Sequence, residues 1–452
     1  MAEWCAPMSG SRRRRRRVEM ALSSQLDARP SPLVEATVIT REVAIVERTS
    51  KNACHASGSS TSASSGPHVC ADLLDSLLHE IILLINSFHD FLAFIGTCRS
   101  WRASVSSFPS LYTFSFLPLH LKPDAPYFQP HTRGIKPLIL SNCKWQLSDP
   151  CKKTLSRSCS VSQNTPNSMS YLGCSYGYLI FTYDEHCLLV NAYTGTKVKP
   201  PILPCDNNLG YLSGIGVLAA PFNSPNSRLL LFSKASMFEW QVGTSYWSVY
   251  PLVFDHERIH QIVFFQGRIL VIDALMRLHT VQLTPQFSMQ QVKIIWQSLE
   301  HLPVNPWLVT CGDMLLMVDL SFRSLYSGEP YDISSTDYSR IFVVFCLDFS
   351  VKPAKWVKME KLENQALFFS FDKRNPAFCC MNPERWGGKS NCIYVARLTD
   401  DPDESWTAVE LGQSVPNQGT THNMMYGFAF PPDYSQIGSL WLFPSLVYGA
   451  SP

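Results

Sequence analysis

Hydrophobic residues change their spacing along the chain near residue 111. Before that point, between residues 70 and 102, apolar positions recur three and four residues apart; after it, short apolar runs alternate with clusters of Gly, Pro, Asn and Asp. The first spacing places side chains on one face of a helix, whereas short runs bounded by turn residues are typical of strands. The sequence therefore predicts a helical module at 67–112 and a β domain at 122–448.

The first predicted helix carries a broad apolar face. Six aliphatic side chains share that face: Leu74, Leu77, Leu78, Ile81, Ile82 and Ile85. Asp72 or Asp75 is expected to cap this helix and Asp90 the second one, because a carboxylate accepts from free backbone N–H groups. A third helix opens at 99–102, and Pro109 discourages its continuation. Helices with more Leu and Ile than one small core needs predict a surface for a partner; a helical cap packed on the β domain is the alternative.

Three pairs of apolar runs predict β-hairpins, since each pair flanks a turn sequence. The pairs are 262–265 with 268–272 around Gln266-Gly267, 307–310 with 314–318 around Gly312-Asp313, and 178–181 with 188–190 around Asp184-Glu185. A last strand is predicted at Leu440–Phe443, after a loop at Pro431–Asp433. Pairing of this strand with the first blade would close a ring and remove exposed sheet edges.

Four tryptophans form an approximate repeat in the β region. Trp247, Trp296, Trp356 and Trp406 are 49, 60 and 50 residues apart, and each lies in a strand-like run. Periods of about 50 residues are typical of propeller blades. The predicted fold class is therefore α+β multidomain, with a short helical module followed by an all-β propeller-like domain of about six blades. A pair of β-sandwiches is the structural alternative.

The residues before 67 are predicted to form a disordered tail. They include the arginine run Arg12–Arg17 and a Ser-rich stretch at 57–66 that cannot offset its own ordering entropy, although Val34–Val46 is apolar enough for a docked strand. The formal charge is +2, yet the chain without the arginine run carries 32 basic against 36 acidic residues. Nucleic-acid binding is therefore not expected of the folded part. The arginine run is expected to be a nuclear-import signal, a non-specific nucleic-acid contact or a solvated charge run.

Fifteen cysteines raise the question of disulfides or a metal site. No apolar signal segment follows Met1, so we expect reduced, buried thiols and a location in the cytoplasm, the nucleus or both. No C-x-x-C pair is present, so neither zinc nor another cofactor is predicted. His79, Glu80 and Asp90 interrupt the longest apolar stretch, and a soluble protein without membrane contact is expected.

One short motif suggests an enzyme. Residues 173–177, Gly-Cys-Ser-Tyr-Gly, fit G-x-S-x-G, the nucleophile elbow that joins a strand to a helix in hydrolases. Here the following run, 178–181, is predicted as a strand, so the glycines serve a turn, and His186 is not assigned to a triad. Residues 386–389 lack the full phosphate-loop spacing and predict a tight turn before a strand at 392–395. The sequence therefore predicts no catalytic activity.

The helical segment resembles an F-box. It ends in Cys98-x-x-Trp101-Arg102, although Leu74-Asp75 replaces the usual Leu-Pro of the first turn. Downstream, the stretches Gly173–Leu179, Trp386–Cys392 and Leu440–Ser445 occur together in a familiar order. Over residues 70–448 the chain resembles the plant family of F-box proteins with a C-terminal β-propeller-like domain of uncharacterised function.

This resemblance implies the substrate-recognition subunit of an SCF-type ubiquitin ligase. The F-box would dock on a Skp-type adaptor and through it on a cullin, while the β domain would bind a target protein. The implied adaptor-binding residues are Leu73, Leu74, Leu77, Leu78, Ile81, Ile82, Leu92, Cys98 and Trp101. Tyr211, Trp307 and Trp386 are candidate target contacts, with core packing as the alternative. The alternative function is a non-ubiquitin β-propeller scaffold or ligand-binding protein with a degenerate F-box.

Overall fold

The computed structural model describes residues 73–85, 88–106, 118–123, 144–150, 152–160, 169–204, 214–233, 235–252, 259–283, 286–296, 303, 306–323, 339–396, 406–415 and 438–442. Several predictions lie outside the described residues: the tail at 1–66 with Arg12–Arg17, the strand at Val34–Val46, the cap Asp72, the loop at Pro431–Asp433 and the contact residue Tyr211. Within the described ranges, no helix is both long and apolar enough to cross a membrane.

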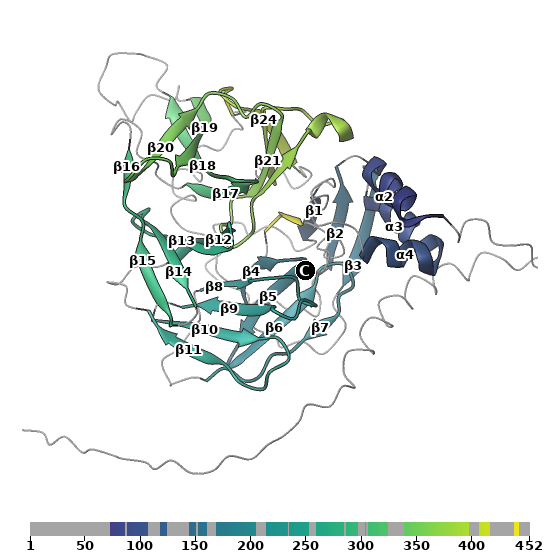
Figure 1. Ribbon diagram of the computed structural model, residues 1–452, viewed down its shortest axis with the longest axis horizontal. Coiled ribbons are helices and arrows are strands. Elements are labelled where there is room, and N and C mark those ends of the chain that lie inside the picture. Colours follow the sequence, from purple (N-terminus) through teal and green to yellow (C-terminus); the bar gives the residue numbers. More distant parts are fainter. Residues whose placement is uncertain are drawn as a thin grey trace, which may run out of the picture. The chain divides into compact units, whose positions relative to one another are not determined.

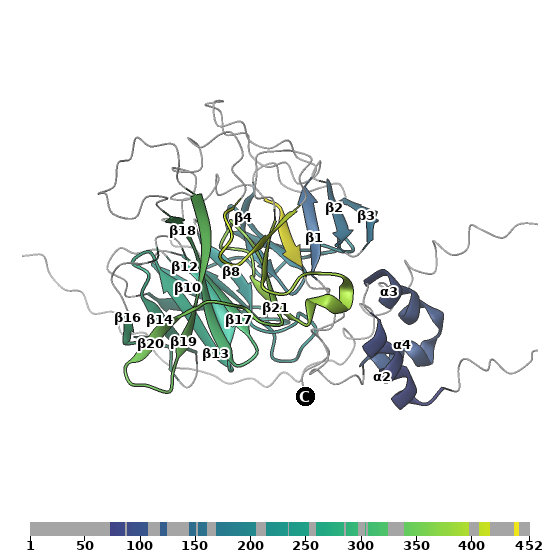
Figure 2. The same cartoon turned by 90° about the horizontal axis from the view of Figure 1, so that it is seen from above.

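Three short helices form where the apolar spacing predicts them (Figure 2): α2 (Asp75–Leu84), α3 (Phe88–Thr97) and α4 (Arg99–Ser106). Among the described side chains, their core contains four buried ones, namely Leu78, Ile82, Phe91 and Phe94. His79 Nε2 lies 3.1 Å from the carbonyl oxygen of Ser104, which links α2 to α4. We call residues 73–106 the helical module.

The helix starts differ from the predicted caps. Leu74 occupies the N-cap position of α2 and makes no side-chain capping bond, while Asp75 is the first helical residue. Asp90 lies inside the first turn of α3, which begins at Phe88. Both carboxylates therefore interact favourably with the positive end of a helix dipole, and the prediction of Asp75 as the cap of the first helix is wrong.

The strands form six sheets, the blades of a propeller (Figure 1). Blade 1 contains β1 (Leu119–Pro123), β2 (Lys144–Asp149), β3 (Lys152–Ser160) and β25 (Leu440–Leu442); blade 2 contains β4 (Ser170–Ser175), β5 (Tyr178–Tyr183), β6 (His186–Asn191) and β7 (Lys197–Val198). Blade 3 contains β8 (Ile215–Leu218), β9 (Arg228–Phe232), β10 (Ser236–Gln241) and β11 (Ser248–Pro251); blade 4 contains β12 (Ile259–Phe265), β13 (Arg268–Asp273), β14 (Leu278–Gln282) and β15 (Ser288–Gln291).

The last two blades depart from the simple four-strand order. Blade 5 contains β17 (Trp307–Cys311), β18 (Met314–Arg323), β19 (Ser339–Asp348), β20 (Ala354–Met359) and an added edge strand, β16 (Ile294–Trp296), which pairs parallel with β20. Blade 6 contains β21 (Gln365–Ser370), β22 (Phe378–Met381), β23 (Cys392–Ala396) and β24 (Trp406–Glu410), and the 3-10 helix η6 (Pro383–Trp386) connects β22 to β23. The prediction of about six blades is confirmed.

The two ends of the β domain meet in blade 1. β25 pairs antiparallel with β1, with Trp441 opposite His120. The last strand of the chain thus completes the blade that its first strands begin, which confirms the predicted ring closure. Trp441 is fully buried and its ring packs against His120, with centroids 5.2 Å apart, and against Phe368 of blade 6 at 5.0 Å.

All three predicted hairpins are present: β5 with β6, β12 with β13, and β17 with β18. Gln266 and Gly267 both have positive φ, as do Tyr176 and Gly177 in the turn between β4 and β5. Two-residue turns of this kind match the right-handed twist of the flanking strands.

The period of about 50 residues implied one tryptophan in each blade. The tryptophan repeat does not follow the blades in this way. Trp296 of β16 and Trp356 of β20 belong to the same sheet and are directly paired. Trp247 immediately precedes β11, and Trp406 begins β24. The repeat marks outer strands, and its long middle interval runs from the end of β16 through β17, β18 and β19 to β20 of the same blade.

The cysteines include one disulfide that sequence analysis did not predict. Cys311 of β17 and Cys379 of β22 are bonded, with their Cα atoms 5.2 Å apart. The expectation of reduced thiols is therefore wrong for this pair. Cys174, Cys187 and Cys380 are free and buried, as the interpretation of structural thiols expects.

Candidate functional site

The surface of the helical module carries exposed leucines. Leu74 and Leu77 are 69% and 49% exposed, and Leu73 is 36% exposed. Leu84, at the other end of α2, is 79% exposed. Since these side chains exceed what the module encloses, the start of α2 presents an apolar patch, which we define as Leu73, Leu74 and Leu77.

Two of the predicted adaptor-binding residues do not belong to that surface. Leu78 and Ile82 are 1% and 2% exposed and form the core of the module with Phe91 and Phe94. The broad face predicted for α2 is therefore divided, because α3 and α4 cover one half of it. The prediction that Leu78 and Ile82 lie on the binding surface is therefore wrong for the isolated chain. The side chains that cover them belong to the helical module and not to the β-sheets.

The other predicted adaptor contacts are intermediate. Ile81 is partly buried at the edge of the core, and the Trp101 ring lies 4.6 Å from that of Phe94. The Cys98 sulfur lies 3.1 Å from Ser100 Oγ. The side chain of Leu92 lies outside the described residues.

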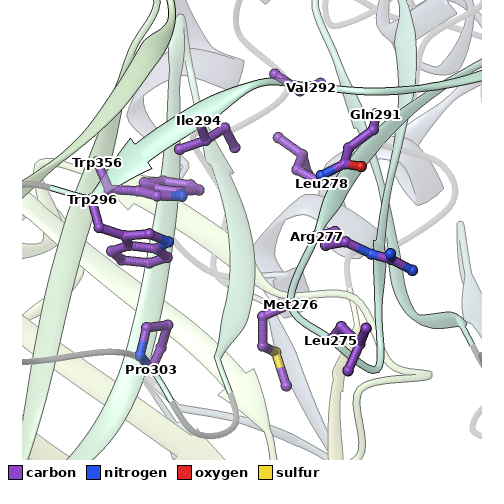
Figure 3. Close-up of a pocket in the computed structure, with 10 residues that line it drawn as sticks. All are labelled: Leu275, Met276, Arg277, Leu278, Gln291, Val292, Ile294, Trp296, Pro303 and Trp356. Carbon is purple, nitrogen blue, oxygen red and sulfur yellow. The ribbon is translucent and has the colours of Figure 1, made fainter. Parts of the chain in front are cut away.

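The β domain has a cavity at the outer edge of blades 4 and 5 (Figure 3). Its volume is about 270 Å³, and the stacked rings of Trp296 and Trp356 form one wall, with centroids 6.1 Å apart. The opposite side holds Met276 and Arg277. Arg277 Nε donates to Asp273 Oδ2 at 2.8 Å, which fixes the guanidinium at this turn. The two paired tryptophans thus have a common place in the wall of this cavity. Among the described residues, the lining contains no buried polar group without a partner.

A larger cavity of about 500 Å³ lies where blades 4, 5 and 6 meet. The turns of the β12–β13 and β17–β18 hairpins line it, together with β22, η6 and the Cys311–Cys379 disulfide. Its aromatic and thioether lining comprises Phe264, Phe265, Met314, Phe378, Met381 and Trp386. Its polar groups include Asp313, Gln365 and Arg385. We call it the three-blade cavity.

A loop at 371–377, between β21 and β22, connects blade 6 to blade 2. Arg374 donates to Asp372 Oδ2 and to the carbonyl oxygen of Tyr171 on β4, both at 2.6 Å. The Tyr171 hydroxyl donates to Asn375 Oδ1 at 2.5 Å, and burial raises the pKa of Tyr171 well above its usual value. Gly173 permits this approach, because a Cβ there would lie 2.7 Å from the Arg374 carbonyl oxygen. The loop thus ties non-adjacent blades together.

Lys373 in the same loop is a buried amine. Its Nζ has no hydrogen-bond partner among the described residues and lies 5.6 Å from the centroid of the Trp307 ring. Burial lowers the pKa of Lys373 to about 7, and the Asp319 carboxylate partly opposes that shift. Trp307 is itself buried and stacked on Phe369, so core packing explains this predicted contact residue.

The G-x-S-x-G segment has the strand context that the sequence predicts. It runs from β4 through a turn into β5, and no helix follows. Ser175 Oγ donates to the carbonyl oxygen of Leu218 at 3.2 Å. Ser175 pairs with one end of β5 and His186 with the other, so the two cannot act together. Residues 386–389 likewise form the end of η6 and a turn before β23, as predicted.

Comparison with known proteins identifies the β domain. Residues 147–426 match the family described as KIB1-4 beta-propeller. The chain belongs to the KIB1-4 beta-propeller family. This membership agrees with the six sheets, and it is consistent with a role in protein interactions.

No curated protein matches the sequence of this KIB1-4 beta-propeller, and two solved structures show a distant similarity to it. One is a complex of S. cerevisiae Dbp5 with Nup159, Gle1, IP6 and ADP, at 10% identity and a TM-score of 0.26, covering 49% of this chain and 56% of that chain. Another is the yeast Nup82–Nup159–Nup116 nucleoporin complex, at 13% identity and a TM-score of 0.23, covering 39% and 42%. The chain thus spans about half the length of these solved chains.

Proposed function

We propose that this protein is the substrate-recognition subunit of an SCF-type ubiquitin ligase. The helical module docks on a Skp-type adaptor and through it on a cullin, and the propeller binds the target protein. The observation that supports this most is the apolar patch of Leu73, Leu74 and Leu77, which stays exposed beside a module core formed by other side chains. A helix that only covered the propeller would have no reason to keep these side chains in solvent.

The energies show what the patch can contribute. Fully burying an exposed leucine stabilises a complex by about 1.5–3 kcal/mol, and these three are partly covered already. Association costs on the order of 4–15 kcal/mol in lost translational and rotational freedom. The patch is therefore necessary but not sufficient, and we expect further contacts from α3 and α4, including Trp101.

The propeller's part in this proposal is to hold the target, without chemistry of its own. Ubiquitin transfer then depends on proximity, since the receptor raises the effective concentration of target lysines near the conjugating enzyme. Such a protein needs no cofactor and works in the cytoplasm, the nucleus or both. Ser175 lies before a turn that joins two strands and not before a helix, which supports a receptor over a hydrolase.

A paired charge substitution tests adaptor docking. Leu74→Lys with Leu77→Lys places two ammonium groups in the patch, and we expect loss of binding to a purified Skp-type adaptor in a pull-down. Both residues are exposed, so the melting temperature should stay within a few degrees of wild type. The matched control is Leu84→Lys, which adds a charge at a still more exposed leucine at the far end of α2 and should bind normally. Adaptor binding by the double variant would refute the proposal.

One observation favours a second function, that of a β-propeller scaffold or ligand-binding protein with a degenerate F-box. The first turn has Asp75 where the usual pattern has proline, and Asp75 occupies the first helical position. Wild-type protein that captures no adaptor at micromolar concentration, while its helices remain folded, would favour this alternative.

A further inference from the structure

The three-blade cavity has the features of a peptide-binding site. Its volume of about 500 Å³ falls within the range of roughly 300–1,000 Å³ in which proteins hold small ligands. Apolar side chains line more than half of it, and the polar side chains of the lining belong to Gln266, Thr310, Asp313, Gln365, Asn382 and Arg385. The question is what those polar groups would recognise.

Gln365 is the first of them. It is 8% exposed, it lines the cavity from the start of β21, and its buried Oε1 has no hydrogen-bond partner in the part of the chain that the structure describes. No hydrogen bond of its side-chain amide is present among the described residues. A buried amide without partners loses its hydration on folding and gains nothing in return, unless a ligand supplies the missing groups.

A second glutamine in the same protein shows what such an amide binds. Gln261 of β12 is also buried, and its Nε2 donates to the carbonyl oxygen of Leu308 at 2.9 Å. Its Oε1 accepts from the backbone N–H of Leu308 at 2.6 Å. The side-chain amide thus pairs with both groups of one residue's backbone. Gln365 offers the same donor and acceptor to the cavity, where no backbone group of the described residues pairs with them.

Asp313 supplies a charge at the mouth of the cavity. It belongs to the β17–β18 turn, it is exposed, and its carboxylate forms no ion pair within the described part of the chain. The turn is held in place because Gln266 Nε2 donates to the backbone carbonyl oxygen of Asp313 at 3.4 Å. The other charged residue of the lining, Arg385, donates from its guanidinium to the carbonyl oxygen of Leu83 in the helical module. A carboxylate without a counter-ion favours a cationic ligand.

We infer that the three-blade cavity binds an extended peptide segment of a partner protein that carries an arginine or lysine beside a large apolar residue. The peptide backbone pairs with the Gln365 amide, the apolar side chain packs among Phe264, Phe378 and Met381, and the basic side chain reaches Asp313. This inference rests on the proposed function in one respect: it names the class of target segment that the propeller holds.

A pair of degenerate peptide mixtures tests the inference. The full chain is immobilised and incubated with heptapeptides that have arginine fixed at the centre, and separately with the same mixture carrying glutamate there. We expect the arginine mixture to be captured about tenfold more than the glutamate mixture, since the Asp313 carboxylate attracts the guanidinium and repels the glutamate side chain. Mass spectrometry of the bound fraction should show aromatic and aliphatic residues enriched beside the arginine.

Variants identify the site within the propeller. Asp313→Asn should reduce the preference for arginine to nearly equal capture, whereas Asp184→Asn, the same charge change at an exposed hairpin turn of blade 2, should leave it unchanged. Gln365→Leu should lower capture of both mixtures about fivefold, the effect of one lost hydrogen bond. Equal capture of the two mixtures by wild type, or an undiminished preference in Asp313→Asn, would overturn the inference.

Adaptor binding is measured on the same variants and separates the two proposals. Asp313→Asn and Gln365→Leu should bind the Skp-type adaptor normally, and the Leu74→Lys, Leu77→Lys variant should still capture the arginine mixture. Failure of peptide capture with adaptor binding intact rejects only the cavity. Failure of adaptor binding with peptide capture intact rejects only the ligase role.

Discussion

The helical module and the propeller use similar apolar residues in opposite ways. All six residues of β21 in the propeller are buried, including Leu367, Phe368 and Phe369. Only Leu78 and Ile82 are buried among the ten residues of α2, while Leu77 and Leu84 are exposed. Neighbouring blades cover both faces of a sheet in the propeller. In the helical module, the two short helices α3 and α4 cover only one side of α2. The difference shows where the chain has apolar surface that its own fold does not enclose.

The largest stability effect is expected in the propeller. Trp441→Ala removes a fully buried ring from the strand that closes blade 1, where His120, Phe368 and Trp406 contact it. We expect the free energy of unfolding to fall by about 3–5 kcal/mol, because such a substitution leaves a large cavity. Urea unfolding measures the change. A loss below about 1 kcal/mol would mean that ring closure contributes little to the fold.

Two leucines on α2 sharpen the comparison within the helical module. Leu78→Ala should destabilise the module by about 2–5 kcal/mol, because Leu78 is buried between the three helices. Leu74→Ala, four residues earlier and exposed, should change the free energy of unfolding by less than about 0.5 kcal/mol. Hydrogen exchange of the α2 and α3 amides reads out the module separately from the propeller. Equal effects of the two substitutions would contradict the division of α2 into a buried and an exposed half.

A buried lysine gives the propeller a pH-dependent stability. Because the pKa of Lys373 is lowered from 10.5 to about 7 in the folded chain, the unfolded state binds more protons between these values. Lys373 therefore destabilises the fold fully below pH 7, and that destabilisation disappears as the pH rises toward 10.5. Lys373→Met should increase the free energy of unfolding by about 2–4 kcal/mol at pH 6, with a smaller gain at pH 9.5.

The control for this measurement is Lys358→Met, which removes an amine that is 46% exposed and paired with Glu360. It should change the stability by less than about 1 kcal/mol at either pH. A gain for Lys373→Met that is the same at pH 6 and pH 9.5 would show that the amine is solvated, and that the effect comes from packing against Trp307 alone.

Much of the architecture could be predicted from the sequence, because its signals are local. The turn at Gln266-Gly267 with apolar runs on both sides predicts one hairpin, and the strand at Leu440 predicts ring closure. The spacing of Leu74 to Ile85 predicts a helix. These signals depend on residues that are neighbours in the chain or in one strand pair.

The remaining features depend on contacts that no local pattern encodes. Cys311 and Cys379 are 68 residues apart and meet only because β17 and β22 are adjacent strands of neighbouring blades. Gln365 and Asp313 reach one cavity for the same reason. The periodicity of α2 assigns Leu74 and Leu78 to one face, and only the packing of α3 and α4 separates the exposed residue from the buried one.

Hydrogen–deuterium exchange of the full chain, with and without a purified Skp-type adaptor, tests the central claim most directly. If the leucines at the start of α2 are kept for that partner, adaptor addition slows exchange of the amides at 73–85 and leaves β21 and β23 of the propeller unchanged. Unchanged exchange at 73–85 with saturating adaptor, or protection confined to the propeller, would contradict the account.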